Sequence, residues 1–489
     1  MCSLEEPVLL APPKPTHKTC TKCKTASAVV ILRHSPFCQP CFEFLFVGKY
    51  RTVINRSKPI QSKLRIGKVL LAVSGGHSSL AMLELTAGFT FAAPEQKKKI
   101  HTFGSVSVCH IDESSLFEGS ESTIPRISEM MESKYSIFPY HCEKLEDVFD
   151  PEYTESQSFS EVLEVVSKDL RPGQQGMNLC CFMAEISAQL RDIHQSKLTN
   201  AEKLKALFQH IGKNSAREDI YWHLKMNMLY RRAQKEKCDF IFLGESSTRQ
   251  AIKMISMTSK GRGYSAALDV GSDNTITYQN MTIIRPMKDM LAKEIAVYNR
   301  NHNIDGFVIP TTNWSTKATS KSSIERLTEE FITGLDRDFP STVSTVSRTA
   351  SKLTVSNDLD VGNKCAICLM PIQRDITGWR DRITVMTLDK DRKESSKKDE
   401  SNISDAGECC GGSENANCCS TTSTKTCCSS TQSIPFLNFL CYSCQVDARD
   451  YKAGQFDLPP YAAEVIKSKG RDERLRQQVE EFLLSDDDD

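Results

Sequence analysis

The chain has 489 residues, of which 62 are basic and 62 are acidic, so its formal net charge is zero. This length suffices for two or three domains, and a hydrophobic share of 39% supports a core while leaving part of the chain unpacked. The neutral balance excludes nucleic-acid binding through a positive field over the whole molecule, and no apolar run approaches the ~18 residues of a membrane span.

The first predicted unit, residues 1–60, is built around two Cys-x-x-Cys pairs separated by fourteen residues. The start of the chain lacks the layout of a secretory signal, so we expect an intracellular protein whose clustered cysteines bind metal. Two such pairs provide the four sulfur ligands of a structural zinc site. The expected ligands of a zinc-ribbon-like module are Cys20, Cys23, Cys38 and Cys41.

Residues 61–315 are predicted to form an α/β domain, interrupted by a polar insertion over residues 150–214. Apolar runs predict buried strands at 69–73, 105–112, 136–141 and 238–243. Helices are expected at 80–85, 124–134, 217–237, 250–258 and 289–299. Strands that alternate with helices at this spacing favour a parallel sheet with helices on both faces.

Residues 316–489 contain a second, split cluster, with Cys365 and Cys368 in one half and Cys441 and Cys444 in the other. A low-complexity insert at 389–433, expected to be disordered, separates the halves and carries three doubled cysteines. Because the cost of closing a loop grows slowly with its length, the insert does not forbid a zinc-ribbon-like site. Alternatively, these pairs share one site with the amino-terminal ligands. The chain ends in an acidic tail.

The first predicted strand of the α/β domain leads into a glycine turn and then a helix. Such a turn lets the backbone approach a phosphate, and the helix start presents free N–H groups to it. Two serines at the helix start add hydroxyl groups, although capping of the helix is their alternative role. The candidate nucleotide-binding residues are Ser74, Gly75, Gly76, Ser78 and Ser79.

Residues 73–79 resemble the PP-loop, Ser-Gly-Gly-x-Asp-Ser, of the N-type ATP pyrophosphatases, which share an adenine nucleotide alpha hydrolase-like fold. Ser78 stands where that motif has its aspartate, which argues against ATP and Mg²⁺ binding in this chain. The tRNA-thiolating members carry a second motif, Gly-His-Asn-x-Asp-Asp, and its two aspartates correspond to Thr248 and Arg249. The two cysteines of those enzymes are also missing, with Tyr221 and Trp222 near the first position.

The order of all these features closely resembles the cytoplasmic tRNA 2-thiolation protein 2 family, the second subunits of eukaryotic wobble-uridine thiolases. The resemblance implies a cytoplasmic heterodimer with a catalytic PP-loop paralogue, the first thiolase subunit, and no membrane association. It further implies tRNA as a partner and a thiocarboxylated ubiquitin-related modifier as the sulfur carrier. The wobble uridines of the tRNAs for lysine, glutamate and glutamine would be thiolated, and this chain would have no catalytic residue.

Two other functions remain open. The chain could itself be an adenylating, ATP-dependent tRNA sulfurtransferase, with Asp112 or Glu113 holding Mg²⁺, or a zinc-dependent RNA-binding or assembly protein without a nucleotide. Basic residues on the later predicted helices are candidate phosphate contacts, and a solvated helix face is the alternative. These candidates are Lys225, Arg231, Arg232, Lys253, Lys260 and Arg262.

Overall fold

The computed structural model describes residues 19–32, 35–90, 103–150, 197–271, 273–278, 281–310, 313–316, 318–350, 352–353, 359–376, 378–379, 439–451, 458–462 and 465–466. The chain divides into two compact units. The first comprises Met1–Asp147 and Lys213–Ser356, and the second comprises Val148–Gly212 and Asn357–Asp489. The first unit thus runs past residue 315, where the sequence suggests a boundary.

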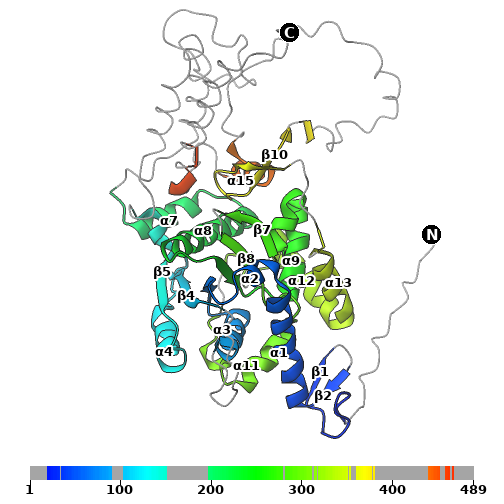
Figure 1. The fold of residues 1–489 in the computed structure, drawn as a ribbon. Coiled ribbons are helices and arrows are strands. Elements are labelled where there is room, and N and C mark those ends of the chain that lie inside the picture. Colours follow the sequence, from blue (N-terminus) through cyan, green and yellow to red (C-terminus); the bar gives the residue numbers. More distant parts are fainter. Residues whose placement is uncertain are drawn as a thin grey trace, which may run out of the picture. The chain divides into compact units, whose positions relative to one another are not determined.

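The first unit is built on a six-stranded sheet with the order β5-β4-β3-β6-β8-β7 (Figure 1). All neighbouring strands are parallel except the edge pair β7 and β8, which is antiparallel. The predicted parallel α/β sheet is therefore confirmed, and the edge hairpin is an addition. In chain order the strands are β3 (Lys68–Ala72), β4 (Ser105–Asp112), β5 (Tyr140–Lys144), β6 (Phe240–Leu243), β7 (Asp273–Tyr278) and β8 (Met281–Ile284).

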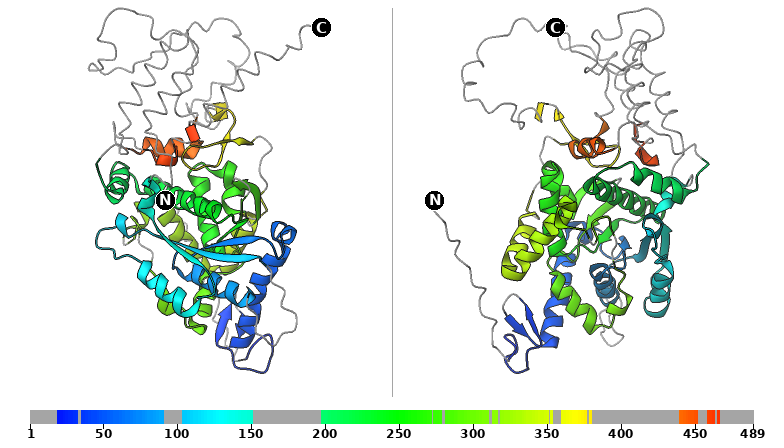
Figure 2. Two further views of the ribbon diagram at one scale, coloured as in Figure 1. Left: turned by 60° about the vertical axis from the view of Figure 1, so that its left-hand side comes forward. Right: turned by 180° about the vertical axis from the view of Figure 1, so that it is seen from behind.

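Helices cover both faces of this sheet (Figure 2). Helix α8 contacts β4 and β6, while α3 packs with α1 and α11 on the other face, and α9 packs with α12 and α13. The helices are α1 (Gln39–Arg56), α2 (Lys58–Ser62), α3 (His77–Thr90), α4 (Ile124–Lys134), α8 (Asn214–Lys235), α9 (Ser247–Ser259), α10 (Ala266–Val270), α11 (Ala292–Asn301), α12 (Ile324–Asp338) and α13 (Pro340–Ala350). Short 3₁₀ turns lie at Ser114–Leu116, Leu145–Phe149, Gly263–Ser265, Asp305–Phe307 and Ser320–Ser322.

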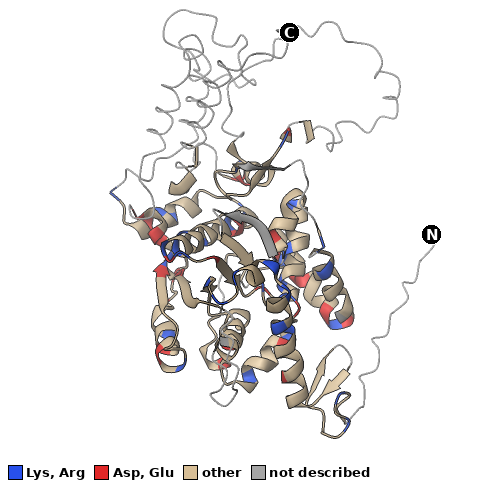
Figure 3. Cartoon of the chain, viewed as in Figure 1, with Lys and Arg blue, Asp and Glu red and all other residues tan. Residues whose placement is uncertain are grey.

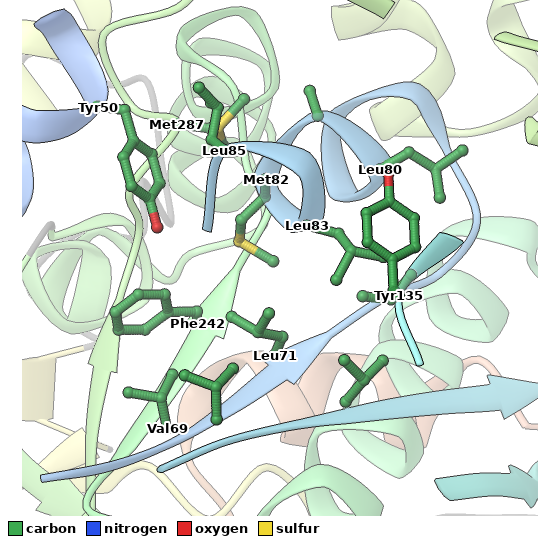
Figure 4. Close-up of a cluster of buried hydrophobic side chains, with 14 of the residues drawn as sticks. Tyr50, Val69, Leu71, Leu80, Met82, Leu83, Leu85, Tyr135, Phe242 and Met287 are labelled. Carbon is green, nitrogen blue, oxygen red and sulfur yellow. The ribbon is translucent and has the colours of Figure 1, made fainter. Parts of the chain in front are cut away.

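The main core lies between β3 and the helices α1 and α3 (Figure 4). Leu71 on β3 and Met82 on α3 are fully buried in it. Tyr50 of α1 is also fully buried, and its hydroxyl lies 2.8 Å from Thr86 Oγ1 on α3. A buried phenol needs such a partner, so this contact fixes α1 against the helix that follows the glycine loop.

A small module precedes α1 in the first unit. Its strands β1 (Val30–Leu32) and β2 (Ser35–Phe37) form an antiparallel pair. Thr21 Oγ1 donates a hydrogen bond of 3.0 Å to Pro36 O, which ties the turn before β1 to β2. The module therefore holds the first two cysteines next to the start of α1.

The second unit contains α7 (Asn200–Gln209), β9 (Leu359–Lys364), β10 (Pro371–Gln373) and α15 (Tyr442–Arg449). Thr199 and Glu202 form a capping box at the start of α7, so the predicted 150–214 insertion ends in a well-defined helix. Residues 151–196 of the insertion lie outside the described residues. So do the 389–433 insert with its doubled cysteines and the acidic tail. Among the described residues, no helix is long and apolar enough to cross a membrane.

Candidate functional site

The four amino-terminal cysteines lie together, with their sulfur atoms all within 4.8 Å of one another. Cys20 and Cys23 sit on a turn that closes through a hydrogen bond of 2.9 Å from Lys24 N to Cys20 O. Cys38 is the N-cap residue of α1, and Cys41 lies in the first turn of that helix. The structure thus brings the four predicted ligands of this cluster together.

The carboxy-terminal cysteines also form a tetrad, although 73 residues separate Cys368 from Cys441. Cys365 and Cys368 lie on the turn between β9 and β10, where Leu369 N donates to Cys365 O at 3.0 Å. Cys441 is the N-cap residue of α15, and Cys444 lies in its first turn. Because each tetrad has its own four thiols, neither needs ligands from the other.

The two tetrads share one local design. In each, the residue after the second cysteine has a positive φ, 59° at Lys24 and 61° at Leu369, so the backbone curls around the sulfur pair. In each, the second pair straddles the start of a helix. A helix N-terminus carries a partial positive charge, which stabilises thiolates there.

Sulfur separations in both tetrads fit a single zinc ion. A tetrahedral zinc with Zn–S bonds of ~2.3 Å places its sulfur ligands about 3.8 Å apart. Cys23 Sγ and Cys38 Sγ are 3.8 Å apart, and Cys368 Sγ and Cys441 Sγ are 3.6 Å apart. These distances are far longer than the ~2.05 Å of a disulfide, and all eight thiols are free.

The thiols of the first tetrad differ in acidity. Hydrogen bonds from the Thr25 side chain and the Ala26 backbone lower the pKa of Cys23 to about 5. Hydrogen bonding to Cys38, together with burial, raises the pKa of Cys41 to about 12. Neighbouring thiolates repel one another, so full ionisation of such a group calls for a cation among the sulfurs.

The glycine loop joins β3 to α3, as the sequence predicts. Gly75 has a φ of +82°, and a Cβ at this position would lie 2.7 Å from Ile309 Cδ1. Ile309 N donates a hydrogen bond of 2.9 Å to Gly75 O, and Gly76 N lies 3.4 Å from Ser74 Oγ. The loop's conformation is therefore held by partners within the chain, and one of its N–H groups, Gly76 N, already faces the Ser74 hydroxyl.

The two serines at the start of α3 have different surroundings. Ser79 Oγ donates a hydrogen bond of 3.0 Å to Gly76 O and lies 3.3 Å from Ser74 Oγ. Ser78 Oγ is buried and has no hydrogen-bond partner among the described residues. At the position of the PP-loop aspartate, the chain thus offers one neutral hydroxyl group.

Gly244, at the end of β6, makes a close backbone contact with this loop. A Cβ on Gly244 would lie 2.8 Å from Ser79 Cα and 3.0 Å from Ser79 N. Both are backbone atoms, which cannot move aside as the end of a side chain can. A glycine is therefore required where the second motif meets the first.

We expect Gly244→Ala to destabilise the first unit by about 1–3 kcal/mol, because the added methyl group forces the two backbones apart. The measurement is chemical denaturation of the purified chain. Gly88→Ala within α3 is the matched control, since nothing lies within 4 Å of its added Cβ, and it should be neutral or slightly stabilising. Equal stability of the two variants would contradict the required close approach.

The positions of the missing aspartates serve packing and helix capping. Thr248 is buried, and its Oγ1 accepts a hydrogen bond of 3.2 Å from Ala292 N at the start of α11. Arg249 forms an ion pair with Glu325 of α12. Ser246 caps α9 by accepting a hydrogen bond from Arg249 N. None of these side chains offers a carboxylate to a metal.

The second motif also contains a buried network that the sequence did not reveal. Glu245 Oε2 lies 2.5 Å from Arg285 Nε, and Glu245 Oε1 lies 2.9 Å from Lys253 Nζ. Arg285 donates further hydrogen bonds of 2.6 Å to the backbone oxygens of Gly271 and Asp269. Glu245 thus joins β6, α9 and the residue after β8.

The carboxylates of the two acidic residues at the end of β4, Asp112 and Glu113, accept hydrogen bonds from other residues of the chain. Asp112 accepts hydrogen bonds from Ser114, Ser122 and Thr123, the shortest being 2.6 Å from Ser122 Oγ. Burial would raise its pKa, but these bonds outweigh burial and hold the pKa below its usual range. Glu113 accepts from Tyr221 Oη and from Lys225 Nζ, at 2.7 Å in the second case.

Most of the candidate RNA-contacting residues form ion pairs inside the first unit. Arg262 is 1% exposed and pairs with Asp269 at 3.2 Å, so the prediction that it meets a phosphate is wrong. The alternative of a solvated helix face also fails for the five that form buried or half-buried ion pairs. The other ion pairs are Lys225–Glu113, Arg232–Glu143, Lys253–Glu245 and Lys260–Asp219, while Arg231 Nε donates to Asn227 Oδ1 at 3.2 Å.

Comparison with known proteins places these features in a family. The family model of cytoplasmic tRNA 2-thiolation protein 2 matches residues 323–446. Cytoplasmic tRNA 2-thiolation protein 2-A of Xenopus laevis is 30% identical over 96% of this chain and 95% of its own length. The Homo sapiens protein of the same family is 26% identical over 98% of this chain and 95% of its own length.

Among solved structures, the U34-tRNA thiolase NcsA from Methanococcus maripaludis, determined with its 4Fe-4S cluster, is similar at a TM-score of 0.45. The two sequences are 14% identical over 69% of this chain and 88% of that one. The relationship rests instead on the match to the Xenopus laevis protein, which spans nearly the whole of both sequences. On that match, the chain belongs to the cytoplasmic tRNA 2-thiolation protein 2 family.

Proposed function

We propose that this chain is the non-catalytic subunit of a heterodimeric tRNA thiolase of the cytoplasm. Membership of the family assigns it a role in tRNA thiolation. In the proposed complex, a catalytic PP-loop paralogue thiolates the wobble uridine of the tRNAs for lysine, glutamate and glutamine. A thiocarboxylated ubiquitin-related modifier supplies the sulfur. This chain stabilises the paralogue and contributes to tRNA binding.

The proposal rests on the residues that stand where a PP-loop enzyme has its aspartates. Mg²⁺ prefers carboxylate oxygens with room for water around them. Here the aspartate positions hold Ser78, Thr248 and Arg249, and the last two contact the chain's own α11 and α12. The residues present therefore do not fit an ATP–Mg²⁺ complex, and we assign the chain no step in uridine activation.

The possibility that the chain is itself a sulfurtransferase is disfavoured by the same contacts. Its strongest candidates for holding Mg²⁺ are Asp112 and Glu113. Asp112 accepts hydrogen bonds from three neighbouring residues, and Glu113 is bound by Tyr221 and Lys225. Recruiting either carboxylate for a metal would break contacts that already satisfy it in the folded chain.

Zinc is the metal that we propose for the two cysteine tetrads. A 4Fe–4S cluster takes its cysteines on different iron atoms, which spreads the sulfurs further apart than a single ion does. The separations of 3.6 and 3.8 Å favour a single ion. With all four positions filled by cysteine, each site would be closed and structural. Zinc would fix the module before α1 in one tetrad and join β9–β10 to α15 in the other.

The test is reconstitution with purified proteins. The chain alone, the catalytic paralogue alone and the pair are each incubated with ATP, the sulfur carrier and a wobble-uridine tRNA. ATP consumption and 2-thiouridine formation are then measured. We expect an inert chain that raises the activity of its paralogue well above the level of the paralogue alone.

Two results would overturn the proposal. Thiolation or adenylation of tRNA by the isolated chain would show that it is an enzyme with metal ligands other than those considered. Full activity of the paralogue alone, together with unaided tRNA binding by this chain, would instead favour a separate RNA-binding or assembly protein.

A further inference from the structure

A stretch of the chain before β3 is strongly basic. Between Phe44 and Gly76 it contains seven basic residues and no acidic one, although the whole chain is neutral. The seven are Lys49, Arg51, Arg56, Lys58, Lys63, Arg65 and Lys68. The stretch covers most of α1, all of α2 and the turn before β3, and Figure 3 marks its Lys and Arg in blue.

Four of these side chains, which we name the basic row, are exposed, form no ion pair with any described residue and, unlike the exposed Lys68, do not face the carboxylate of Asp239. They are Arg51, Arg56, Lys58 and Arg65. Two others in the same stretch are paired, Lys49 with Glu294 at 2.6 Å and Lys63 with Asp239. The contrast with the internally paired cations of α8 and α9 is clear, because the basic row leaves positive charge facing solvent.

The backbone holds the basic row in a fixed shape. Arg65 has a φ of +71° in a turn closed by a hydrogen bond of 2.8 Å from Gly67 N to Lys63 O. Gly104 N donates to Gly67 O at 2.9 Å, and a Cβ on Gly104 would lie 2.6 Å from Ile66 O. The turn is therefore fixed against the start of β4, so its arginine needs little further ordering on binding.

Two members of the basic row, Lys58 and Arg65, lie at the opposite end of β3 from the glycine loop. Lys58 and Arg65 precede β3, whereas Ser74 and Gly75 follow it. The five residues of β3 separate its two ends by about 17 Å. A phosphate held by Lys58 and Arg65 would therefore not occupy the degenerate nucleotide loop.

A hollow of about 500 Å³, lined by both polar and apolar side chains, adjoins the same helix. Thr52 of α1 lines it, and Arg56 lies one helical turn further along the same face. Ser344 of α13 also lines it, is 4% exposed, and its hydroxyl has no hydrogen-bond partner among the described residues. Lys49 and Arg348 also line it, together with Ser247 and Asp289, which follow β6 and β8. The hollow thus offers the hydroxyl group of Ser344 near the positive charge, while the hydroxyl groups of Thr52 and Ser347 already bond to Gly48 O and Gln250 Oε1.

We propose that the basic row and the adjoining hollow bind the sugar–phosphate backbone of tRNA. This inference rests on the proposed function and deepens it by locating the RNA-binding surface. Exposed Arg and Lys side chains neutralise phosphates without reading base edges, and hydroxyl groups in a hollow suit ribose and phosphate oxygens. The row then positions tRNA on this subunit while uridine chemistry takes place on the paralogue.

The test uses the full-length chain in complex with its catalytic paralogue. The variant combines Arg51→Gln, Arg56→Gln, Lys58→Gln and Arg65→Gln. The control removes the same charge elsewhere in the first unit, at the exposed residues Arg300, Lys321, Arg337 and Lys352, each changed to Gln. The affinity for tRNA is measured by fluorescence anisotropy over a range of salt concentrations.

We expect the basic-row variant to bind tRNA at least about tenfold more weakly at moderate salt. Its plot of log K against log salt should be shallower by about 3, since four single-strand phosphate contacts contribute about 0.7 each. The control should stay within about twofold of the wild type. Ultraviolet cross-linking should join the RNA to a peptide from residues 49–68 in the wild type.

Wild-type affinity and salt dependence in the basic-row variant, or an equal loss in the control, would overturn the inference. This outcome is distinct from failure of the proposed function. If the wild-type pair thiolates tRNA and the basic-row variant binds normally, only the location of the surface is wrong. If the chain has no effect on its paralogue's thiolation, the proposed function fails, whatever the binding data show.

Discussion

Cys441→Ser should reduce the zinc content of the purified chain from two ions to one and unfold the carboxy-terminal cysteine module. Cys441 supplies one of four sulfurs that hold together segments 73 residues apart in the sequence. Structural zinc contributes an apparent ~10–16 kcal/mol in small zinc-binding peptides, and loss of one thiolate forfeits much of that. Metal analysis by mass spectrometry and protease sensitivity of residues 359–466 are the measurements.

Two matched variants make this test specific. Cys38→Ser removes a ligand of the other tetrad and should also leave one zinc, with the carboxy-terminal module still protected. Cys418→Ser changes one doubled cysteine of the 389–433 insert and should leave both zinc ions bound. Two bound ions in Cys441→Ser, or iron with acid-labile sulfide in the wild type, would contradict the assignment.

The sequence predicted the central part of the fold because parallel strands are buried on both faces and read as apolar runs. Residues 69–73 and 105–112 correspond closely to β3 and β4, and the predicted helix at 124–134 coincides with α4. The third strand, expected at 136–141, lies later, at Tyr140–Lys144. The long amphipathic helix expected at 217–237 begins earlier, at Asn214.

Several other elements were missed, for reasons that differ from one to the next. In helix α13 the apolar face consists only of the small residues Val343, Val346 and Ala350, with the buried Ser344 and Ser347 beside them, so its signal is weak. Helix α12 does carry a helical period, with Ile324, Leu327, Phe331 and Leu335 three or four residues apart, so the sequence contained its signal. The Ser/Thr/Lys-rich residues 315–323 before it obscured that signal. Strand β8 is only four residues long and ends beside the buried Arg285.

The candidate site was predicted to different extents in its two parts. Cysteine spacing alone identified both groups of four that the structure brings together, because a Cys-x-x-Cys turn encodes its own geometry. The sequence could not predict whether the charged residues contact RNA or pair with acids inside the chain. Whether Lys225 meets RNA or Glu113 depends on α8 packing beside the end of β4, a contact between residues 112 positions apart.

The Glu245 network is the clearest case of such a long-range contact, and its removal has a large expected effect. Glu245→Ala should destabilise the first unit by about 3–5 kcal/mol, because it leaves Arg285 and Lys253 buried without a counter-charge. Denaturant unfolding at neutral pH measures the loss. Glu330→Ala, at an exposed position of α12, is the control and should change stability by less than about 0.5 kcal/mol.

The same network predicts how stability depends on pH. Burial alone would raise the pKa of Glu245, but the charges of Lys253 and Arg285 outweigh it and lower the pKa to about 2. A carboxylate with a lowered pKa stabilises the fold fully above the unfolded-state value of about 4.3, and this contribution falls as pH approaches 2. The stability difference between wild type and Glu245→Ala should therefore be constant near neutrality and shrink below about pH 4. A difference that stays constant down to pH 3 would show that Glu245 stabilises the unit through packing instead of charge.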